Sequence, residues 1–246
     1  MTHYRVSADI GGTFTDFVIE EDGGRIFTGK VSTTPENPAL GVLKGLGDLI
    51  PSPANIDFLV HGTTVGLNAF LERKGERVLL IMTAGVSDSY SIARGDRKEL
   101  YTLKYRKPER LVPRRDVFEV RERMKWDGSV LEPLKVSDFD EIIQRIRGEN
   151  INAVAVCLIH SYMNPEHELQ ARAIIEKALP QVSVTLSHEI AREWREYERA
   201  SSAVANAYIA PIVGRYLISL ETQVREMGVR SPLHVMQSSG GVMTLS

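Results

Sequence analysis

A short stretch near the N-terminus brings glycines, hydroxyl groups and carboxylates close together. Its members are Asp9, Gly11, Gly12, Thr13, Thr15 and Asp16. Glycine permits positive φ and a close approach of the backbone that a Cβ atom would block. Successive backbone N–H groups and the two threonine hydroxyls then point at phosphate oxygens. We therefore predict a phosphate-binding hairpin in which the two glycines, the two threonines and Asp16 contact a cofactor.

Asp9 stands at the end of the first predicted strand, directly before the glycines. Mg²⁺ keeps several of its waters and prefers one or two carboxylates together with phosphate oxygens. We predict that Asp9 is the metal ligand and a catalytic residue, and that Asp16 supports either the turn or the metal. An Asp-Gly-rich β-turn that binds nothing is the alternative that these residues leave open.

Two other glycine-rich phosphate motifs do not match the sequence. A P-loop needs Gly-Lys-Ser/Thr before a helix, and the chain has no such sequence. A dinucleotide fingerprint needs a strand, then glycines, then a helix, whereas "TFTDFVI" after Gly12 has the pattern of a strand. A hairpin between two strands is what fits.

The composition is that of a globular protein and narrows the choice of partners. The 246 residues are 43% hydrophobic and 25% charged, and 30 basic and 32 acidic residues give a net charge of −2. No global field favours nucleic acid or an anionic membrane. No apolar run reaches the roughly 18 residues needed to span a bilayer, and the N-terminus does not resemble a secretory signal. With a single cysteine, Cys157, these features indicate the cytoplasm.

The spacing of apolar residues predicts an α/β fold. Alternation over residues 4–10, turns at Gly11-Gly12 and at 22–24, and two further extended segments predict a three-stranded antiparallel meander. A helix over 39–50, weakened by three glycines, is followed by a strand at 56–64, a helix ended by Gly75 and a strand at 77–83. The order β-β-β-α-β-α-β matches the ribonuclease H-like core. We predict that these strands share one sheet, with the Gly11-Gly12 turn at its rim.

The rest of the chain predicts further parts. Residues 84–115 lack periodicity and are interpreted as an ordered excursion or lid, and 116–190 as a second small α/β unit. Residues 191–246 form a long helical segment, kinked or divided at Pro211, and then the start of another domain. We therefore expect residues 1–83 to be the phosphate-binding core and 1–190 to be one N-terminal region.

The opening hairpin resembles the first phosphate motif of the actin, hexokinase and Hsp70-like ATPases. The whole chain is more specifically similar to the hydantoinase A/5-oxoprolinase family. The segments that carry this resemblance are "DIGGTFTDFVI", "HGTTVGLNAFLERKG", "VPRRDVFEVRERMKWDGSVLEPL", "AVAVCLIHSYMNPEHE", "EWREYERASSAVANAYIAPIVGRYL" and "HVMQSSGGVM". They cover nearly the whole chain in the family's order.

The resemblance implies an ATP- and Mg²⁺-dependent enzyme that opens cyclic amides of the hydantoin or 5-oxoproline type. Phosphorylation would turn the amide oxygen into a leaving group. It also implies a partner subunit of the hydantoinase B type. The open alternatives are a subunit of an acetone or acetophenone carboxylase, an actin-like small-molecule kinase, and a non-catalytic support module.

The resemblance adds site residues at a predicted strand-to-helix junction, where free N–H groups and hydroxyls favour an anion. There His61 and Thr63 are expected to be catalytic, and Gly62 and Thr64 to bind the cofactor. His61 would hydrogen-bond a phosphate or move a proton. The alternative is that Thr63 or Thr64 only caps the following helix.

Two arginines and three histidines complete the candidates. Arg94 and Arg97 are three residues apart, so on a helix they would converge on one anion; otherwise they are a solvated pair. Three further histidines are predicted to be structural because their spacing is not that of a metal site: His160, His167 and His188. Cys157, inside an apolar strand, is predicted to be a buried and inert thiol.

The sequence departs from the actin-like pattern in one respect. Such ATPases clamp the nucleotide between two halves, each with its own Asp-Gly-rich hairpin, and this chain has one. We interpret it as the N-terminal part of a longer enzyme, and we expect it to fold alone but to bind nucleotide weakly and not to turn it over.

Overall fold

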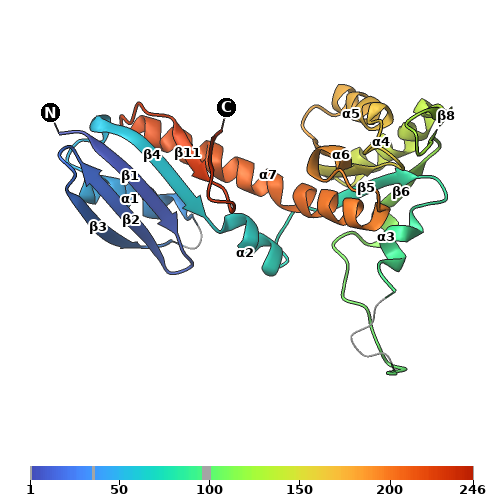
Figure 1. Ribbon diagram of the computed structural model, residues 1–246, viewed down its shortest axis with the longest axis horizontal. Coiled ribbons are helices and arrows are strands. Elements are labelled where there is room, and N and C mark those ends of the chain that lie inside the picture. Colours follow the sequence, from blue (N-terminus) through green and yellow to red (C-terminus); the bar gives the residue numbers. More distant parts are fainter. Residues whose placement is uncertain (1, 35–36, 96–100, 246) are drawn as a thin grey trace. The chain divides into compact units, whose positions relative to one another are not determined.

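The computed structural model describes residues 2–34, 37–95 and 101–245. Its contacts divide the chain into two compact units (Figure 1). Unit 1 consists of Met1–Glu72 and Ile212–Ser246, and unit 2 consists of Arg73–Pro211. Unit 2 therefore interrupts unit 1 in the sequence, and the division differs from the one predicted at residue 83.

Unit 1 is built on a six-stranded mixed sheet. Its strands are β1 (Tyr4–Ile10), β2 (Phe14–Glu21), β3 (Ile26–Ser32), β4 (Ile56–Thr63), β11 (Leu233–Met236) and β12 (Val242–Thr244), in the order β12-β11-β4-β1-β2-β3. The first three strands are antiparallel, which confirms the predicted meander. β4 is parallel to β1, and β11 is parallel to β4. The β1–β2 turn therefore lies at the end of the sheet where β1 and β4 both finish.

Helices cover one face of this sheet. The helical elements of unit 1 are α1 (Ala39–Leu49), the 3-10 turn η1 (Pro53–Asn55), α2 (Val65–Leu71) and the second half of α7 (Glu196–Glu226). The core holds apolar residues of β1, β2, β4 and β11 against α1 and α7. In β1 the buried residues alternate with more exposed ones, as the period of two predicts. The opposite face of β1 and β2 is thus open to solvent.

The glycines of α1 allow the helix to lie close to the sheet. A Cβ atom at Gly41 would be 2.7 Å from Thr15 Oγ1, and one at Gly45 would be 2.1 Å from Cζ of Phe17. At Gly47 the nearest such atom, of Met227, is 3.8 Å away. Two of the three glycines that weaken the helix prediction are therefore needed by its packing.

The predicted place of the strand at 77–83 was wrong. This strand, β5 (Val78–Thr83), lies in the sheet of unit 2. All of its residues are buried, and it needs apolar cover on both faces. β11, from the far end of the chain, occupies the place beside β4. The preceding helix also ends at Leu71, before Gly75.

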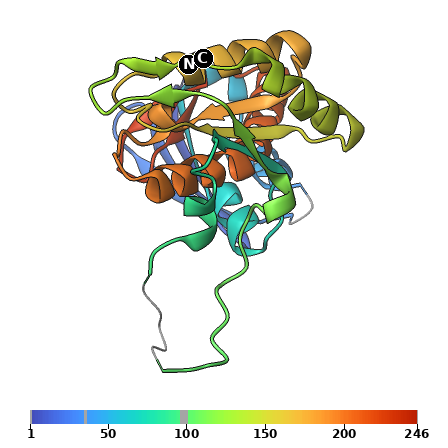
Figure 2. The same ribbon diagram turned by 90° about the vertical axis from the view of Figure 1, so that its right-hand side faces the viewer.

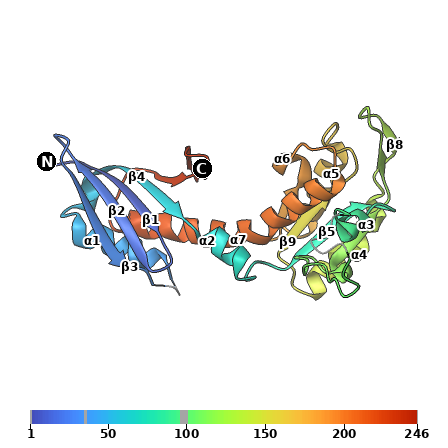
Figure 3. The same ribbon diagram turned by 60° about the horizontal axis from the view of Figure 1, so that its bottom comes forward.

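Unit 2 contains a four-stranded parallel sheet in the order β10-β9-β5-β6. Besides β5 its strands are β6 (Val117–Val120), β9 (Ala153–Cys157) and β10 (Ser183–Leu186), and β7 (Arg123–Met124) and β8 (Val130–Glu132) form a separate hairpin. Its helical elements are α3 (Asp88–Ile92), η2 (Arg114–Asp116), η3 (Val136–Asp138), α4 (Phe139–Gly148), α5 (Glu166–Ala178), α6 (Ser187–Ile190) and the first half of α7. α4 and α5 cover one face and α7 the other, which makes three layers (Figure 3).

A long loop and a long helix bear on two of the predictions, the excursion at 84–115 and the helix kinked or divided at Pro211. Residues 101–113 form no helix or strand and extend away from the sheet as a long loop (Figure 2). α7 begins at Glu196 and runs through Pro211 as one helix of 31 residues. Among the described residues, α7 alone is long and apolar enough to cross a membrane by length and composition. That evidence is weak, because its apolar residues lie in the cores of both units.

Candidate functional site

The turn between β1 and β2 consists of Gly11, Gly12 and Thr13. The N–H of Gly11 donates to Phe14 O at 2.9 Å and closes the turn. The positive φ that glycine permits is not used here, because neither glycine lies in the left-handed region. Gly11 is instead required by proximity, since a Cβ there would be 3.0 Å from Phe14 O, while a Cβ at Gly12 would meet open space. The exposed tip therefore has room for a ligand beside Gly12.

Asp9 lies at the junction of three strand ends. Its register partners are Asp16 on β2 and Gly62 on β4. The Asp9 side chain occupies the space above Gly62, because a Cβ at Gly62 would be 2.6 Å from Asp9 Oδ1. Asp9 and Asp16 are exposed on the open face of the sheet. The structure therefore brings together three of the predicted site residues, two of them carboxylates.

Asp16 has a cationic partner on the next strand. Lys30 on β3 is its register partner, and Lys30 Nζ lies 3.1 Å from Asp16 Oδ1. Lys30 Nζ also lies 4.9 Å from the centre of the Phe14 ring. Like charges directly opposite one another destabilise a strand pair. Lys30 offsets part of that repulsion between Asp9 and Asp16.

Thr15 does not face the open side, and the prediction that its hydroxyl points at phosphate does not agree with its position. It is fully buried, and its Oγ1 lies 3.1 Å from Thr33 Oγ1. Thr33 in turn donates to Gly11 O at 3.1 Å. Because side chains alternate along a strand, Thr15 and Asp16 must face opposite sides. Thr15 thus supports the turn from the core side.

His61 is also on the core side. It is fully buried in β4, and its Nδ1 lies 3.0 Å from Ala8 O. Its Nε2 lies 2.8 Å from the hydroxyl of Tyr216 on α7. Burial lowers the pKa of His61 to about 4, so the ring is neutral at pH 7. Both ring nitrogens have protein partners, so its placement favours a supporting role over contact with phosphate.

Thr63 and Thr64 form the turn from β4 into α2. Thr63 Oγ1 accepts from Val65 N at 3.2 Å, and Thr64 Oγ1 donates to Ile10 O at 3.4 Å. Thr64 occupies the N-cap position without a side-chain capping bond. Thr64 is thus the N-cap by position, while Thr63 supplies the side-chain acceptor for the first N–H group of α2. Thr64 joins the end of β4 to the end of β1 beside the glycine turn.

Tyr216 is a site residue that the sequence reasoning did not identify. Its hydroxyl hydrogen-bonds His61 Nε2, and the side chain of Thr63 lowers its pKa against the larger raising effect of burial. It lies within "EWREYERASSAVANAYIAPIVGRYL", a segment of the family resemblance, but nothing in its spacing connects it with residues 9–16. Only the folded chain brings a residue of α7 to β4.

Arg94 belongs to unit 2, where it follows α3. Its Nε donates to Glu198 Oε1 at 2.8 Å, and its side chain is 62% exposed. The structure thus pairs Arg94 with a carboxylate of α7, and its binding to an anion stays a prediction. Arg97 lies outside the described residues, so its pairing with Arg94 stays a prediction.

The three histidines that the sequence predicts to be structural lie in unit 2. His167 Nδ1 is 2.7 Å from Glu122 Oε2, and His188 Nδ1 is 2.6 Å from Glu168 Oε2. His160, with φ of 55°, contacts the hydroxyl of Tyr162 at 3.3 Å. Within the part of the chain that the structure describes, no group of three or more His, Cys, Asp or Glu side chains is placed to hold a metal ion. The histidine pairs are interior contacts.

A buried arginine near the start of α7 is hydrogen-bonded to Ser187, the residue before His188. Arg199 is fully buried and donates to Ser187 Oγ at 3.0 Å and to the carbonyl groups of Glu193 and Leu158, each at 2.7 Å. Cys157 lies nearby, and burial raises the pKa of its thiol to about 12. This agrees with the prediction of an inert thiol.

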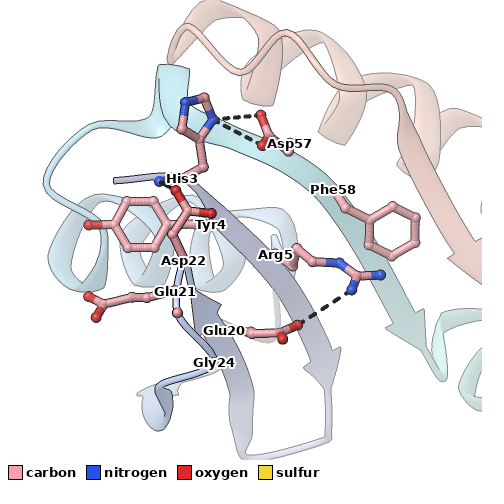
Figure 4. A pocket seen from close by; sticks show the side chains of 10 residues that line it. His3, Tyr4, Arg5, Glu20, Glu21, Asp22, Gly24, Asp57 and Phe58 are labelled. Atoms are coloured by element: carbon pink, nitrogen blue, oxygen red, sulfur yellow. Dashed lines mark hydrogen bonds and ion pairs between the residues drawn. The ribbon is translucent and has the colours of Figure 1, made fainter. Parts of the chain in front are cut away.

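A hollow of about 400 Å³ lies at the other end of the unit 1 sheet (Figure 4). His3, Arg5, Asp57 and Glu20 line it. His3 Nδ1 lies 2.9 Å from Asp57, and Arg5 lies 3.5 Å from Glu20. Because β1 starts here and reaches the glycine turn only at its far end, this hollow does not belong to the candidate site.

The carboxylate oxygens at this site suit Mg²⁺, which keeps water molecules as ligands, better than a metal ion whose ligands are all protein side chains. Asp9 and Asp16 are hard oxygen donors that face solvent from adjacent strands. One or two carboxylates, with waters and phosphate completing the shell, are what Mg²⁺ prefers. Asp9 would hold such an ion, whereas Asp16 is engaged by Lys30.

The fold and this site define a class: two α/β units, one of which carries a glycine turn and two carboxylates at the end of a mixed sheet. The chain belongs to the hydantoinase/oxoprolinase family. Residues 5–179 match the hydantoinase/oxoprolinase N-terminal region, and residues 199–246 match the hydantoinase/oxoprolinase domain.

Three relatives illustrate the range of the family. The chain is 36% identical to the caprolactamase subunit alpha of Pseudomonas jessenii, over 97% of its own length and 36% of that protein's. It is 32% identical to the acetophenone carboxylase gamma subunit of Aromatoleum aromaticum, over 96% and 35%, and 30% identical to 5-oxoprolinase 1 of Arabidopsis thaliana, over 97% and 21%.

The structure agrees with the sequence similarity. It matches the crystal structure of ATP-dependent caprolactamase from Pseudomonas jessenii with a TM-score of 0.87 and 34% identity, over 97% of this chain and 36% of that one. The chain therefore spans little more than a third of the caprolactamase subunit that it matches.

Proposed function

We propose that this chain provides the first nucleotide phosphate-binding part of an ATP-dependent hydrolase that opens cyclic amides. The observation that carries the proposal is the position of Asp9 above Gly62, beside the open glycine turn. A carboxylate at this place can hold Mg²⁺, while the N–H groups of Gly12 and Thr13 are available to phosphate oxygens at the exposed tip.

The strand order of unit 1 supports an actin-like, ribonuclease H-like half. From the β3 edge of the sheet, the three antiparallel strands β3, β2 and β1 are followed by β4 and β11, both parallel to β1. Under this proposal unit 2 is an insertion between the second helix and the fifth strand of that core. The nucleotide would lie at the end of β1 and β4, where Asp9, Gly62 and Thr64 meet.

The cofactors of the proposed reaction are ATP and Mg²⁺. Bound Mg²⁺ would neutralise charge on the phosphate groups as it does in other phosphoryl-transfer enzymes. The chain's own residues would orient the nucleotide: Asp9 through the metal, and the glycine turn through its N–H groups. Transfer of the terminal phosphoryl group to the amide oxygen would make that oxygen a leaving group and the ring carbon an acceptor for hydroxide.

Relatives named caprolactamase and 5-oxoprolinase support a cyclic amide as substrate. The relative named acetophenone carboxylase gamma subunit favours a second candidate, ATP-dependent carboxylation of a ketone. The two relatives named as subunits also support a partner subunit. Under either proposal ATP activates an oxygen atom of the substrate. That oxygen belongs to a cyclic amide in the hydrolase and to a ketone in the carboxylase.

Nucleotide binding is tested by calorimetry with Mg·ATP on this chain. We expect weak but measurable binding, and Asp9→Asn should weaken it about tenfold, the equivalent of about 1.4 kcal/mol. Asp9→Asn removes a full charge with little change of volume. The matched control is Asp48→Asn, because Asp48 is an exposed carboxylate of the same unit that pairs with Lys44 on α1.

Equal affinities for the unaltered protein and Asp9→Asn would remove Asp9 from the metal site. An equal loss in Asp48→Asn would show that any lost charge has this effect. Measuring phosphate release by the complete enzyme distinguishes the hydrolase from the carboxylase. Stimulation by a lactam, hydantoin or 5-oxoproline supports the hydrolase, and stimulation only by a ketone with bicarbonate supports the carboxylase.

A further inference from the structure

A hydroxyl group from α7 lies directly beneath the corner formed by Asp9 and Gly62. Tyr216 packs against the core of unit 1, and its hydroxyl reaches His61 Nε2 at 2.8 Å. The two ring centres are 5.8 Å apart. Tyr216 is therefore two contacts away from the exposed Asp9 although the two residues lie on opposite sides of the sheet.

The hydrogen bonds have one consistent direction. Ala8 O can only accept, so His61 Nδ1 must carry the proton and donate to it at 3.0 Å. Nε2 of the neutral ring then accepts, and the Tyr216 hydroxyl donates. Burial raises the pKa of Tyr216, which keeps the phenol protonated at neutral pH. This chain of bonds connects α7 through β4 to β1 at the residue before Asp9.

The same phenol contacts the other neighbour of Gly62. The side chain of Thr63 lies close enough to the Tyr216 hydroxyl to lower its pKa, against the larger raising effect of burial. Thr63 Oγ1 accepts in addition from Val65 N, at the first turn of α2. His61 and Thr63 flank Gly62 in sequence, so Tyr216 is bonded to one neighbour of the residue over which the Asp9 carboxylate lies and is close to the other.

We propose that Tyr216 is a positioning residue for the nucleotide site, which holds Gly62 in place beneath Asp9 through His61 and Thr63. This inference rests on the proposed function. A shift of Gly62 toward the open face would displace the Asp9 carboxylate, since no side chain separates them. Loss of the phenol hydroxyl would also leave buried His61 Nε2 without its donor, and a buried polar atom without a partner favours rearrangement.

The test is a double-mutant cycle of Tyr216→Phe and Asp9→Asn, read by calorimetry with Mg·ATP. Tyr216→Phe keeps the ring and removes only the hydroxyl. We expect it to weaken Mg·ATP binding about fivefold, and to have little further effect in Asp9→Asn, because the two changes disable the same contact. The control is Tyr208→Phe, which removes a hydroxyl from the same helix within unit 2.

Unchanged Mg·ATP affinity in Tyr216→Phe, or a loss that adds fully to that of Asp9→Asn, would overturn the proposal, because a residue important only for stability gives additive effects. Failure of the proposed function looks different: the unaltered protein would not bind Mg·ATP, or Asp9→Asn would change nothing. The nitrogen-15 spectrum of His61 in the unaltered protein is independent of any variant's folding. It should show the neutral tautomer with the proton on Nδ1, and the other tautomer would contradict the bond direction.

Discussion

At the scale of single residues, alternation along the strands decides which members of the opening motif can reach a ligand. Asp9 and Asp16 face solvent together, whereas Thr15 and His61 lie on the core side. The buried pair is not idle, because Thr15 supports the glycine turn through Thr33, and His61 connects β4 to β1. The open face provides the candidate ligand contacts, and the buried face fixes their position.

His61 should make the stability of unit 1 depend on pH. Its folded pKa of about 4 is below the ordinary value of 6.5, so the unfolded chain takes up a proton that the folded unit does not. The free energy of unfolding should be constant above pH 6.5 and should fall as the pH approaches 4, by up to about 3 kcal/mol. Urea unfolding followed by hydrogen exchange in β1 and β4 measures this.

His61→Asn provides the comparison for that measurement. Asparagine has an N–H donor for Ala8 O and does not titrate. This variant should be less stable at pH 7 and should lose little more between pH 6.5 and 4. A pH dependence as steep as that of the unaltered protein would show that His61 is not its source.

At the scale of elements, the packing of α1 against the sheet depends on which of its glycines face the sheet. Gly45→Ala should lower the free energy of unfolding of unit 1 by about 1–2 kcal/mol, because the new methyl group would overlap the Phe17 ring. A gain in helix propensity of up to about 1 kcal/mol offsets part of this loss. Urea unfolding of unit 1 measures the difference.

Gly47→Ala is the matched control within the same helix. A Cβ there would be 3.8 Å from the nearest atom, an ordinary contact, so the propensity gain of about 0.5–1 kcal/mol should appear alone. If Gly45→Ala were as stabilising as Gly47→Ala, the close packing of α1 against β2 would be wrong.

At the scale of the whole molecule, the described residues form separate apolar cores in the two units, and α7 contributes to both units. A change confined to one core should therefore leave the other unit's stability largely unaltered. We expect Gly45→Ala to speed hydrogen exchange in β1, β2 and β4 but not in β5, β9 and β10. Mass spectrometry of the exchanged peptides checks this. Equal acceleration in both sets would show that the chain unfolds as one cooperative body.

The sequence alone determined the local structure and the chemical character of this protein. Alternation of apolar residues and the glycine turns predicted the meander, and the family segments predicted the hydantoinase/oxoprolinase family, which the comparisons confirm. These properties depend on residues that are neighbours in the chain. The pattern over Thr15 and Asp16 also contained the alternation that separates them, although the prediction placed both at the ligand.

Only the tertiary structure decided which distant segments meet. β5 and β11 are both short apolar strands that could lie beside β4, and the choice depends on which surfaces the remaining chain covers. Buried His61 likewise has its Nε2 partner in Tyr216, which is 155 residues away in the sequence. Such pairings are set by packing between elements that no local pattern encodes, and so the support beneath the candidate site became visible only in the folded chain.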